Sequence, residues 1–141
     1  MSQEQLNSEA NSSETTAGAN KLCVLVVDDS ATIRRSAETM LSNEGCEVIT
    51  AENGFEALSK ITRHQPNLIF VDIMMPRLDG YQTCAIIKNN SDFRDTPVVM
   101  LTSKDGLFDM ARGRVLGTDQ YLTKPFTREE LLGAVKQHTS R

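Results

Sequence analysis

The chain has 141 residues, 39% of them hydrophobic and 24% charged, and its formal net charge is −4. A chain of this length and composition can bury one full hydrophobic core, so we expect a single globular domain. The negative net charge argues against nucleic acid as the main partner, because phosphate binding requires a concentrated basic surface.

The sequence also carries no sign of membrane insertion or secretion. No apolar stretch approaches the roughly 20 residues that a membrane-spanning helix needs. The N-terminus lacks the basic and apolar regions of a secretory signal. Cys23, Cys46 and Cys84 are far apart and lack metal-ligand spacing, which is typical of buried thiols in a reducing compartment. We therefore expect a cytoplasmic protein that is not inserted in a membrane.

The first 20 residues differ in amino-acid composition from the rest of the chain. They are rich in Ser, Asn, Thr, Glu and Ala and contain almost nothing apolar. Such a segment cannot bury enough surface to offset the entropy cost of ordering it. We expect residues 1–20 to form a disordered tail and residues 21–141 to form the domain.

From residue 21 onward, short apolar runs alternate with amphipathic segments. The apolar runs are predicted strands that are buried on both faces. These strands cover residues 22–27, 46–50, 68–71, 97–102 and 120–122. A helix is predicted after each strand. The helix starts are placed after Ser30, at Asn53, at Gly80, near Leu107 and at Thr127.

Five strands alternating with five helices predict a parallel α/β sheet with right-handed crossovers. In open sheets of this class, ligands bind at the carboxyl ends of the strands, in the crevice where the strand order reverses. The hydrophobic periodicity does not distinguish a 2-1-3-4-5 strand order from a 3-2-1-4-5 order.

Polar side chains follow four of the five predicted strands. Asp28 and Asp29 come after the first strand, Asp72 after the third, Thr102 at the end of the fourth and Lys124 after the fifth. With the 2-1-3-4-5 order, the three aspartates would converge at one crevice. Each of these residues has an alternative interpretation, because a strand-end Asp can cap a helix, a Thr can occupy a turn and a Lys can lie in solvent. Their occurrence together favours one shared reaction.

That reaction is phosphoryl transfer. Three neighbouring carboxylates repel one another, and a Mg²⁺ ion, which prefers oxygen ligands and phosphate, would relieve the repulsion. Asp72 can act as the carboxylate nucleophile that forms an acyl phosphate. Thr102 can donate a hydrogen bond to a phosphoryl oxygen, and Lys124 can compensate the charge. Asp79 and Asp105 do not follow a predicted strand directly and are interpreted as turn residues.

Four segments with these residues resemble the receiver domain of bacterial two-component response regulators. The segments are Val26-Val27-Asp28-Asp29-Ser30, residues 71–80 around Asp72, Leu101-Thr102-Ser103 and residues 121–126 around Lys124. The resemblance covers about residues 22–138. It implies a flavodoxin-like (βα)5 three-layer sandwich with a five-stranded parallel sheet of order 2-1-3-4-5.

The resemblance also implies roles for individual residues. Asp72 resembles the phosphoacceptor, and Asp28 and Asp29 resemble the acidic pair that holds Mg²⁺ with Asp72 and the backbone carbonyl of Met74. Thr102 and Tyr121 resemble the switch hydroxyl and the aromatic ring that follows it. Lys124 resembles the phosphate-binding lysine, followed by a peptide bond to Pro125 that is often cis in the family.

The chain is also expected to lack an output domain, which is typical of stand-alone, chemotaxis-type receivers that signal by binding. Segments 32–38, 76–84 and 103–109 are similar to the small regulators of type IV pilus twitching motility. This similarity implies a chemotaxis-type sensor histidine kinase as phosphodonor and a motility or pilus regulatory protein as output partner. It implies a monomer or a weak, phosphorylation-dependent dimer. The expected output surface comprises residues 104–115, Tyr121 and residues 128–138.

Two enzymes are the main alternatives to this non-enzymatic binding switch. A Mg-dependent phosphatase of the haloacid-dehalogenase type also uses a strand-end aspartate, but it needs a second acid two residues later, where this chain has Met74. A dinucleotide-binding oxidoreductase would need a Gly-rich turn where the chain has Asp28-Asp29-Ser30. Because Met74 offers no good hydrogen bond to a hydrolytic water, we also expect slow self-dephosphorylation.

Overall fold

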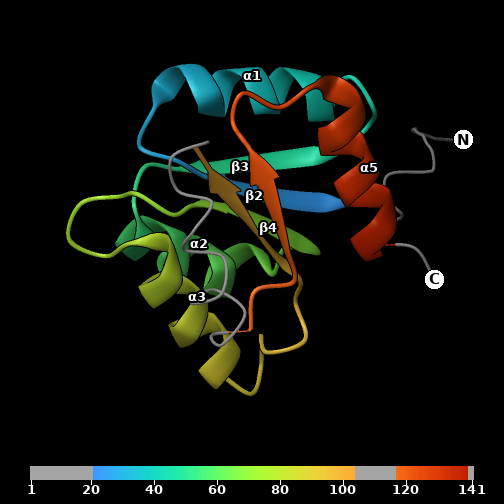
Figure 1. The fold of residues 1–141 in the computed structure, drawn as a ribbon. Helices are drawn as coiled ribbons and strands as arrows, with labels where there is room; N and C mark the ends of the chain where they lie inside the picture. The colour runs from blue at the N-terminus through green and yellow to red at the C-terminus, as the bar shows by residue number, and fades with distance from the viewer. Residues whose placement is uncertain (1–20, 104–116, 140–141) are drawn as a thin grey trace, which may run out of the picture.

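The structure is a computed structural model, and it describes residues 21–103 and 117–139. Within these residues, five parallel strands form one sheet that is covered by helices on both faces (Figure 1). The strands are β2 (Cys23–Val27), β3 (Glu47–Ala51), β4 (Leu68–Asp72), β5 (Val98–Thr102) and β6 (Gln120–Thr123). The helices are α1 (Ala31–Ser42), α2 (Gly54–His64), α3 (Gly80–Asn89) and α5 (Arg128–Thr139).

The strands lie in the order β3-β2-β4-β5-β6, which is 2-1-3-4-5 when they are counted along the chain. The predicted flavodoxin-like order is therefore confirmed. The order reverses between β2 and β4, where Val27 is paired with Val71. The next residues, Asp28 and Asp72, therefore lie side by side at the carboxyl edge of the sheet. The fold thus places the two acids together at the edge where ligands bind in sheets of this class.

Two apolar layers hold the sheet between the helices. Alternate residues of each strand point to opposite faces. One layer contains Val26, Phe70 and Leu101 with buried residues of α1 and α5, and the other contains Val27 and Val71 with buried residues of α2 and α3. Because both faces are covered, the central strands β4 and β5 are buried along their whole length, as their continuous apolar runs predict.

Side-chain caps fix the helix starts. Ser30 Oγ accepts from the Ile33 amide at 3.3 Å, and Asn53 Oδ1 accepts from the Glu56 amide at 2.8 Å. The expectation that Asp79 is only a turn residue is wrong. Asp79 and Gln82 form a reciprocal capping box at the start of α3, in which each side chain accepts from the other residue's amide.

The predicted and observed elements differ by single residues at their ends. The second strand begins at Glu47 instead of Cys46, because the Cys46 amide donates to the carbonyl of Leu41 and so belongs to the turn after α1. The predicted tail (1–20) and the predicted fourth helix (107–115) lie outside the described residues. No helix in the described part of the chain is long and apolar enough to cross a membrane.

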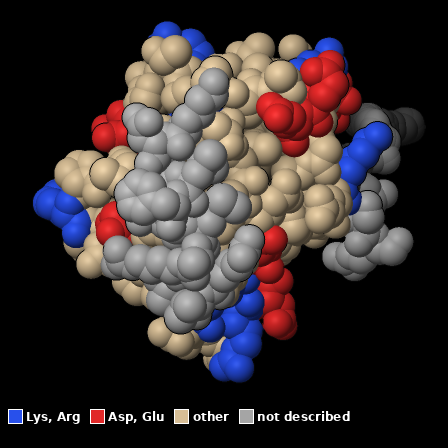
Figure 2. All heavy atoms as spheres, in the orientation of Figure 1, with Lys and Arg blue, Asp and Glu red and all other residues tan. Residues whose placement is uncertain are grey.

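Charged side chains are distributed in small separate groups over the face seen in Figure 2. The basic side chains on that face form no continuous stripe among the residues that the structure describes. The absence of nucleic-acid binding stays a prediction from the net charge of −4.

Candidate functional site

The predicted site residues meet at the carboxyl edge of the sheet. Asp28 follows β2, Asp72 ends β4, Thr102 ends β5 and Lys124 follows β6. The residues Asp28, Asp72 and Thr102 are almost fully buried, with exposed fractions of 0%, 3% and 2%. Asp29 is exposed. The site is therefore a rim at which one acid faces solvent and the others lie just below the surface.

The three aspartates form one acidic cluster. One carboxylate oxygen from each of Asp28, Asp29 and Asp72 lies within 4.8 Å of the others. A set of oxygen-only donors at this spacing fits a hard divalent cation such as Mg²⁺, which is usually held by one or two carboxylates together with waters and phosphate. The predicted convergence of the three acids is therefore observed.

Lys124 provides the positive charge at this cluster. Its Nζ atom lies 3.1 Å from Asp28 Oδ2 and 3.1 Å from Asp72 Oδ1. The backbone holds the lysine in place, because the Lys124 amide donates to the carbonyl of Thr102 at 2.7 Å. The following peptide bond, Lys124–Pro125, is cis. A single ammonium thus bridges two buried carboxylates.

This environment changes the acidity of Asp72 and Lys124. Burial, followed by repulsion from Asp28, raises the pKa of Asp72 from 3.8 to about 6, although Lys124 and the Met74 amide oppose the change. Burial acts to lower the pKa of Lys124, but the Asp72 and Asp28 carboxylates outweigh it, and the pKa is raised. At neutral pH, Asp72 is therefore mostly ionised while Lys124 stays protonated.

The loop after β4 packs closely against Asp72, which is 3% exposed. Ile73 is buried and its amide donates to the carbonyl of Leu101 at 3.1 Å, whereas Met74 is 70% exposed. The Met74 amide donates to Asp72 Oδ1 at 3.3 Å. Gly80 closes the loop so tightly that a Cβ at this position would lie 2.5 Å from the carbonyl oxygen of Asp72. The loop thus holds Asp72 in place, with the exposed Met74 beside it.

The sequence of this chain matches a known family along most of its length. The response regulator receiver domain matches residues 24–136. The chain belongs to the response regulator receiver domain family.

Individual relatives support this membership. Protein PilG of Pseudomonas aeruginosa is 71% identical over 117 residues, which are 83% of this chain and 87% of PilG. Seven further curated relatives, among them the probable transcriptional regulator ycf27 of Porphyridium aerugineum, are longer, and the chain spans between 43% and 48% of their length.

Solved structures of other receivers share the fold. A putative response regulator from Chloroflexus aurantiacus is 32% identical with a TM-score of 0.82, and the alignment covers 86% of this chain and 100% of the other. The chemotaxis protein CheY4 of Vibrio cholerae is 33% identical with a TM-score of 0.79, and the alignment covers 84% of this chain and 98% of the other.

Two further predicted residues of the receiver lie near the cluster or beside it in the sheet. The Thr102 hydroxyl donates to the carbonyl of Ser103 at 3.0 Å. Tyr121 lies on β6 opposite Met100, partly buried against the α2–α3 layer. The structure therefore places both residues on neighbouring strands, and their role as a switch stays a prediction. Residues 104–115 of the expected output surface lie outside the described residues.

Reasoning from the sequence missed Arg34. Its Nη1 atom donates to the backbone carbonyl oxygen of Asp28 at 2.7 Å. The helical pattern places Arg34 away from the apolar face of α1, and a pattern of this kind carries no signal that a long side chain reaches back to the preceding strand.

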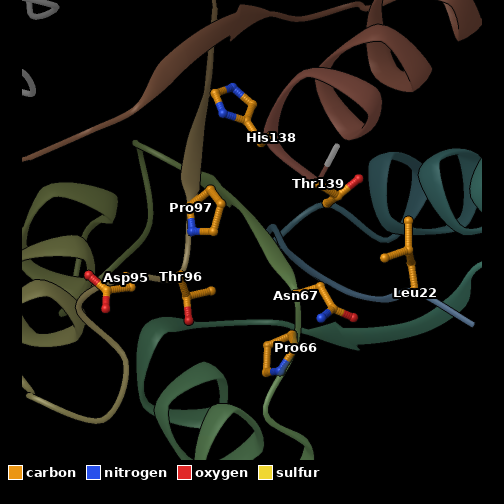
Figure 3. Close-up of a pocket in the computed structure, with 8 residues that line it drawn as sticks. All are labelled: Leu22, Pro66, Asn67, Asp95, Thr96, Pro97, His138 and Thr139. Carbon is orange, nitrogen blue, oxygen red and sulfur yellow. The ribbon is translucent and has the colours of Figure 1, made fainter. Parts of the chain in front are cut away.

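A hollow of about 340 Å³ lies at the opposite edge of the receiver, at the amino ends of β2, β4 and β5 (Figure 3). It is lined by Leu22, Pro66, Asn67, Asp95, Thr96, Pro97, His138 and Thr139. His138 Nε2 lies 2.6 Å from Gln120 Oε1, and Asn67 Oδ1 accepts from the Cys23 amide at 2.8 Å. These hydrogen bonds therefore connect α5 to β6 and the start of β4 to β2, at the edge of the sheet remote from Asp72.

Proposed function

We propose that this receiver accepts a phosphoryl group on Asp72 from the phosphohistidine of a chemotaxis-type sensor histidine kinase. The observation that carries this proposal is the Lys124 ammonium, which lies 3.1 Å from both Asp28 and Asp72 beside a third carboxylate. In the transfer, a carboxylate oxygen of Asp72 bonds to phosphorus while the bond between phosphorus and the histidine nitrogen breaks. The electron pair of that bond returns to the imidazole, and an aspartyl phosphate remains.

The chain's own residues prepare Asp72 for this reaction. Burial, followed by repulsion from Asp28, raises the pKa of Asp72 to about 6, so the carboxylate is more basic than an ordinary Asp and is still mostly ionised at neutral pH. Lys124 is placed to balance the charge that the phosphoryl oxygens bring. Thr102, 2% exposed at the end of β5, supplies a hydroxyl donor at the same edge. These groups would position the phosphoryl group and neutralise its negative charge, which is the main requirement of phosphoryl transfer.

The acidic cluster is the proposed Mg²⁺ site. Asp28, Asp29 and Asp72 would hold the ion, together with the backbone carbonyl of Met74, because their oxygens are hard donors and three of these groups already converge. When bound, Mg²⁺ supplies positive charge to the acids and to the incoming phosphoryl oxygens.

The output of this receiver is proposed to be phosphorylation-dependent binding to a cytoplasmic motility or pilus regulatory protein that controls twitching motility. The 71% identity to PilG and the similarity to CheY4, which is a chemotaxis protein, support this class of partner. The receiver is proposed to act as a monomer or a weak, phosphorylation-dependent dimer.

The proposed output surface comprises residues 104–115, Tyr121 and residues 128–138. Added phosphoryl charge at one end of a two-state surface shifts its population toward the state that a partner prefers. Hydrogen exchange of the phosphorylated protein with its partner would then show protection on this surface, and protection confined to α1 would contradict the assignment.

The phosphatase alternative is not favoured. Such an enzyme would need an acid two residues after the nucleophile to protonate the leaving group. That position is Met74, whose exposed thioether side chain has no proton to donate.

Intact mass spectrometry with acetyl phosphate and Mg²⁺ tests the proposed acceptor. The wild-type protein should gain one phosphoryl group that hydroxylamine removes, because hydroxylamine cleaves acyl phosphates. Asp72→Ala should gain none, whereas Asp95→Ala, a control at the opposite edge of the sheet, should behave as wild type. A phosphoryl group on Asp72→Ala, or one that resists hydroxylamine in the wild type, would show that Asp72 is not the acceptor.

A further inference from the structure

Arg34 connects the first turn of α1 to the end of β2. Its Nη1 atom donates to the carbonyl oxygen of Asp28 at 2.7 Å. The start of the helix fixes the position of this arginine, because the Arg34 amide donates to the carbonyl of Ser30 at 3.1 Å and Ser30 caps the helix. The contact is therefore part of a defined turn and does not depend on an isolated surface side chain.

Arg34 completes the set of partners around Asp28. The Asp28 amide donates to the carbonyl of Ala51 at 3.1 Å. Asp28 Oδ1 accepts from the Ser30 amide at 2.9 Å, and Oδ2 accepts from Lys124 at 3.1 Å. With Arg34 on the carbonyl, each polar atom of Asp28 has a protein partner. A guanidinium on a carbonyl oxygen restricts rotation of the planar peptide group that follows it.

That peptide group leads directly to Asp29. Asp29 is exposed, and no donor among the described residues holds its carboxylate. Its direction is therefore set chiefly by the backbone from which it projects. Asp29 nevertheless contributes an oxygen to the acidic cluster, within 4.8 Å of oxygens from Asp28 and Asp72. The orientation of the Asp28–Asp29 peptide group thus decides whether the exposed acid faces the cluster.

A weaker charge interaction also acts on the Arg34 guanidinium, from Glu56 of the neighbouring helix α2. Glu56, in the first turn of α2, has a pKa lowered chiefly by the hydrogen bond from the Glu52 amide, with smaller contributions from Lys60 and Arg34. Glu56 is itself held by that amide at 2.7 Å and by Lys60 at 3.2 Å. The Glu56 carboxylate therefore adds a weak attraction for the Arg34 guanidinium, beside the hydrogen bond that Arg34 donates to the Asp28 carbonyl.

From these contacts we infer that Arg34 is a positioning residue for the acidic cluster: it holds the Asp28–Asp29 peptide group so that the Asp29 carboxylate faces the cation. This inference rests on the proposed Mg²⁺ site. Simple electrostatics gives the opposite expectation, because removing a positive charge near a cation site should strengthen cation binding. The sign of the change in Mg²⁺ affinity therefore separates positioning from a charge effect.

The test is calorimetric titration of the full, unphosphorylated chain with MgCl₂. Arg34→Met should weaken Mg²⁺ binding by about tenfold, as is typical when a group that orients a metal ligand is lost. Arg34→Lys should recover part of the affinity, because an ammonium can still donate to the carbonyl but lacks the planar fork. Arg35→Met is the matched control, since it removes the same charge from an exposed neighbour on the same helix, and its affinity should stay within about twofold of wild type.

Unchanged or tighter Mg²⁺ binding in Arg34→Met overturns the inference. Thermal unfolding without Mg²⁺ establishes that each variant is folded at the titration temperature. If Arg34→Met does not fold, the Mg²⁺ affinity of Arg34→Lys is the test instead. Wild-type Mg²⁺ affinity in Arg34→Lys then overturns the inference.

An amide spectrum of the metal-free protein separates this inference from the proposed function. The Asp29 amide signal should shift or broaden in Arg34→Met and stay unchanged in Arg35→Met. If the wild type binds no Mg²⁺, the proposed metal site fails, while the Asp29 signal still shows whether Arg34 positions this peptide group. An unmoved Asp29 signal in Arg34→Met overturns the inference by itself.

Discussion

Lys124 Nζ lies 3.1 Å from Asp72 Oδ1, although 52 residues separate the two along the chain. The same ammonium is equally close to Asp28, so one positive charge serves two almost fully buried carboxylates. Burial of the Asp72 carboxylate, followed by repulsion from Asp28, explains why the pKa of Asp72 is raised despite its lysine partner.

Replacing Lys124 should therefore destabilise the protein that lacks Mg²⁺. Lys124→Met leaves two buried carboxylates without their cation, and we expect a loss of about 3 kcal/mol in the free energy of unfolding. Saturating Mg²⁺ should recover part of this loss, because the ion supplies the missing charge. Urea unfolding at pH 7, with and without Mg²⁺, measures both effects.

The control for this experiment is the exposed ion pair between Arg128 and Glu44, whose side chains are 55% and 41% exposed. Arg128→Met should cost less than about 1 kcal/mol, because solvent screens such a pair. A cost for Lys124→Met as small as that for Arg128→Met would contradict the view that the buried ammonium stabilises the cluster.

The raised pKa of Asp72 predicts a pH-dependent stability. Because the folded protein binds this proton more tightly than the unfolded chain does, its stability without Mg²⁺ should fall as the pH rises from about 4 to about 6. The change from 3.8 to about 6 corresponds to a penalty of about 3 kcal/mol above that range. Asp72→Asn should therefore be more stable than wild type at pH 7 by up to this amount, and nearly equal to it at pH 4.

Chemical unfolding at pH 4, 5, 6 and 7 measures this dependence in Mg²⁺-free buffer. Asp95→Asn, at an exposed aspartate on the opposite edge of the sheet, serves as control and should follow wild type throughout. If Asp72→Asn stabilised the protein equally at pH 4 and pH 7, burial of the ionised carboxylate would not be the cause of the stability difference between the variant and wild type.

Much of the site could be predicted because its chemistry lies at the ends of apolar runs. Asp28, Asp72 and Thr102 each interrupt or close a strand that is buried on both faces, so the sequence marks them directly. The strand order could not be derived this way. Helices of similar length can connect strands on either side, and the hydrophobic period is the same in both orders.

Two contacts in the structure could not be predicted from the sequence pattern alone. The capping box of Asp79 and Gln82 has a recognisable spacing, but the nearby Gly80 and Pro76 make a turn an equally reasonable interpretation. The contact from Arg34 to the Asp28 carbonyl has no sequence signature, because it joins a side chain to a backbone atom six residues earlier through a loop. Such contacts depend on the path of the loop, which only the folded structure gives.

Two glycines in helices should respond in opposite ways to the same substitution. Gly80→Ala places a Cβ 2.5 Å from the carbonyl oxygen of Asp72 and 2.8 Å from the Cα of Ile73. Because backbone atoms must move, we expect a loss of about 2 kcal/mol or more and slower phosphorylation by acetyl phosphate. Gly133→Ala on α5 meets nothing within 4 Å and should stabilise the helix by up to about 1 kcal/mol. Urea unfolding of both variants checks the signs, and a fully stable Gly80→Ala would refute the predicted clash.

Met74 is expected to lengthen the lifetime of the phosphorylated state. Its backbone amide donates to Asp72 at 3.3 Å, and the residue is 70% exposed beside Asp72. A thioether offers a water molecule only a weak acceptor, whereas an amide can both donate to it and accept from it. Met74→Asn should therefore accelerate loss of the aspartyl phosphate, by a factor on the order of ten.

The measurement is the decay of the phosphorylated mass after acetyl phosphate has been removed by rapid desalting in the presence of Mg²⁺. Met74→Leu is the matched control, because it keeps an apolar side chain of similar size and should decay at the wild-type rate. Both variants should retain the wild-type stability, since an exposed side chain contributes little packing. If Met74→Asn decays no faster than Met74→Leu, the side chain at this position does not control the hydrolytic water, and the lifetime must be set by the residues that hold the phosphoryl group.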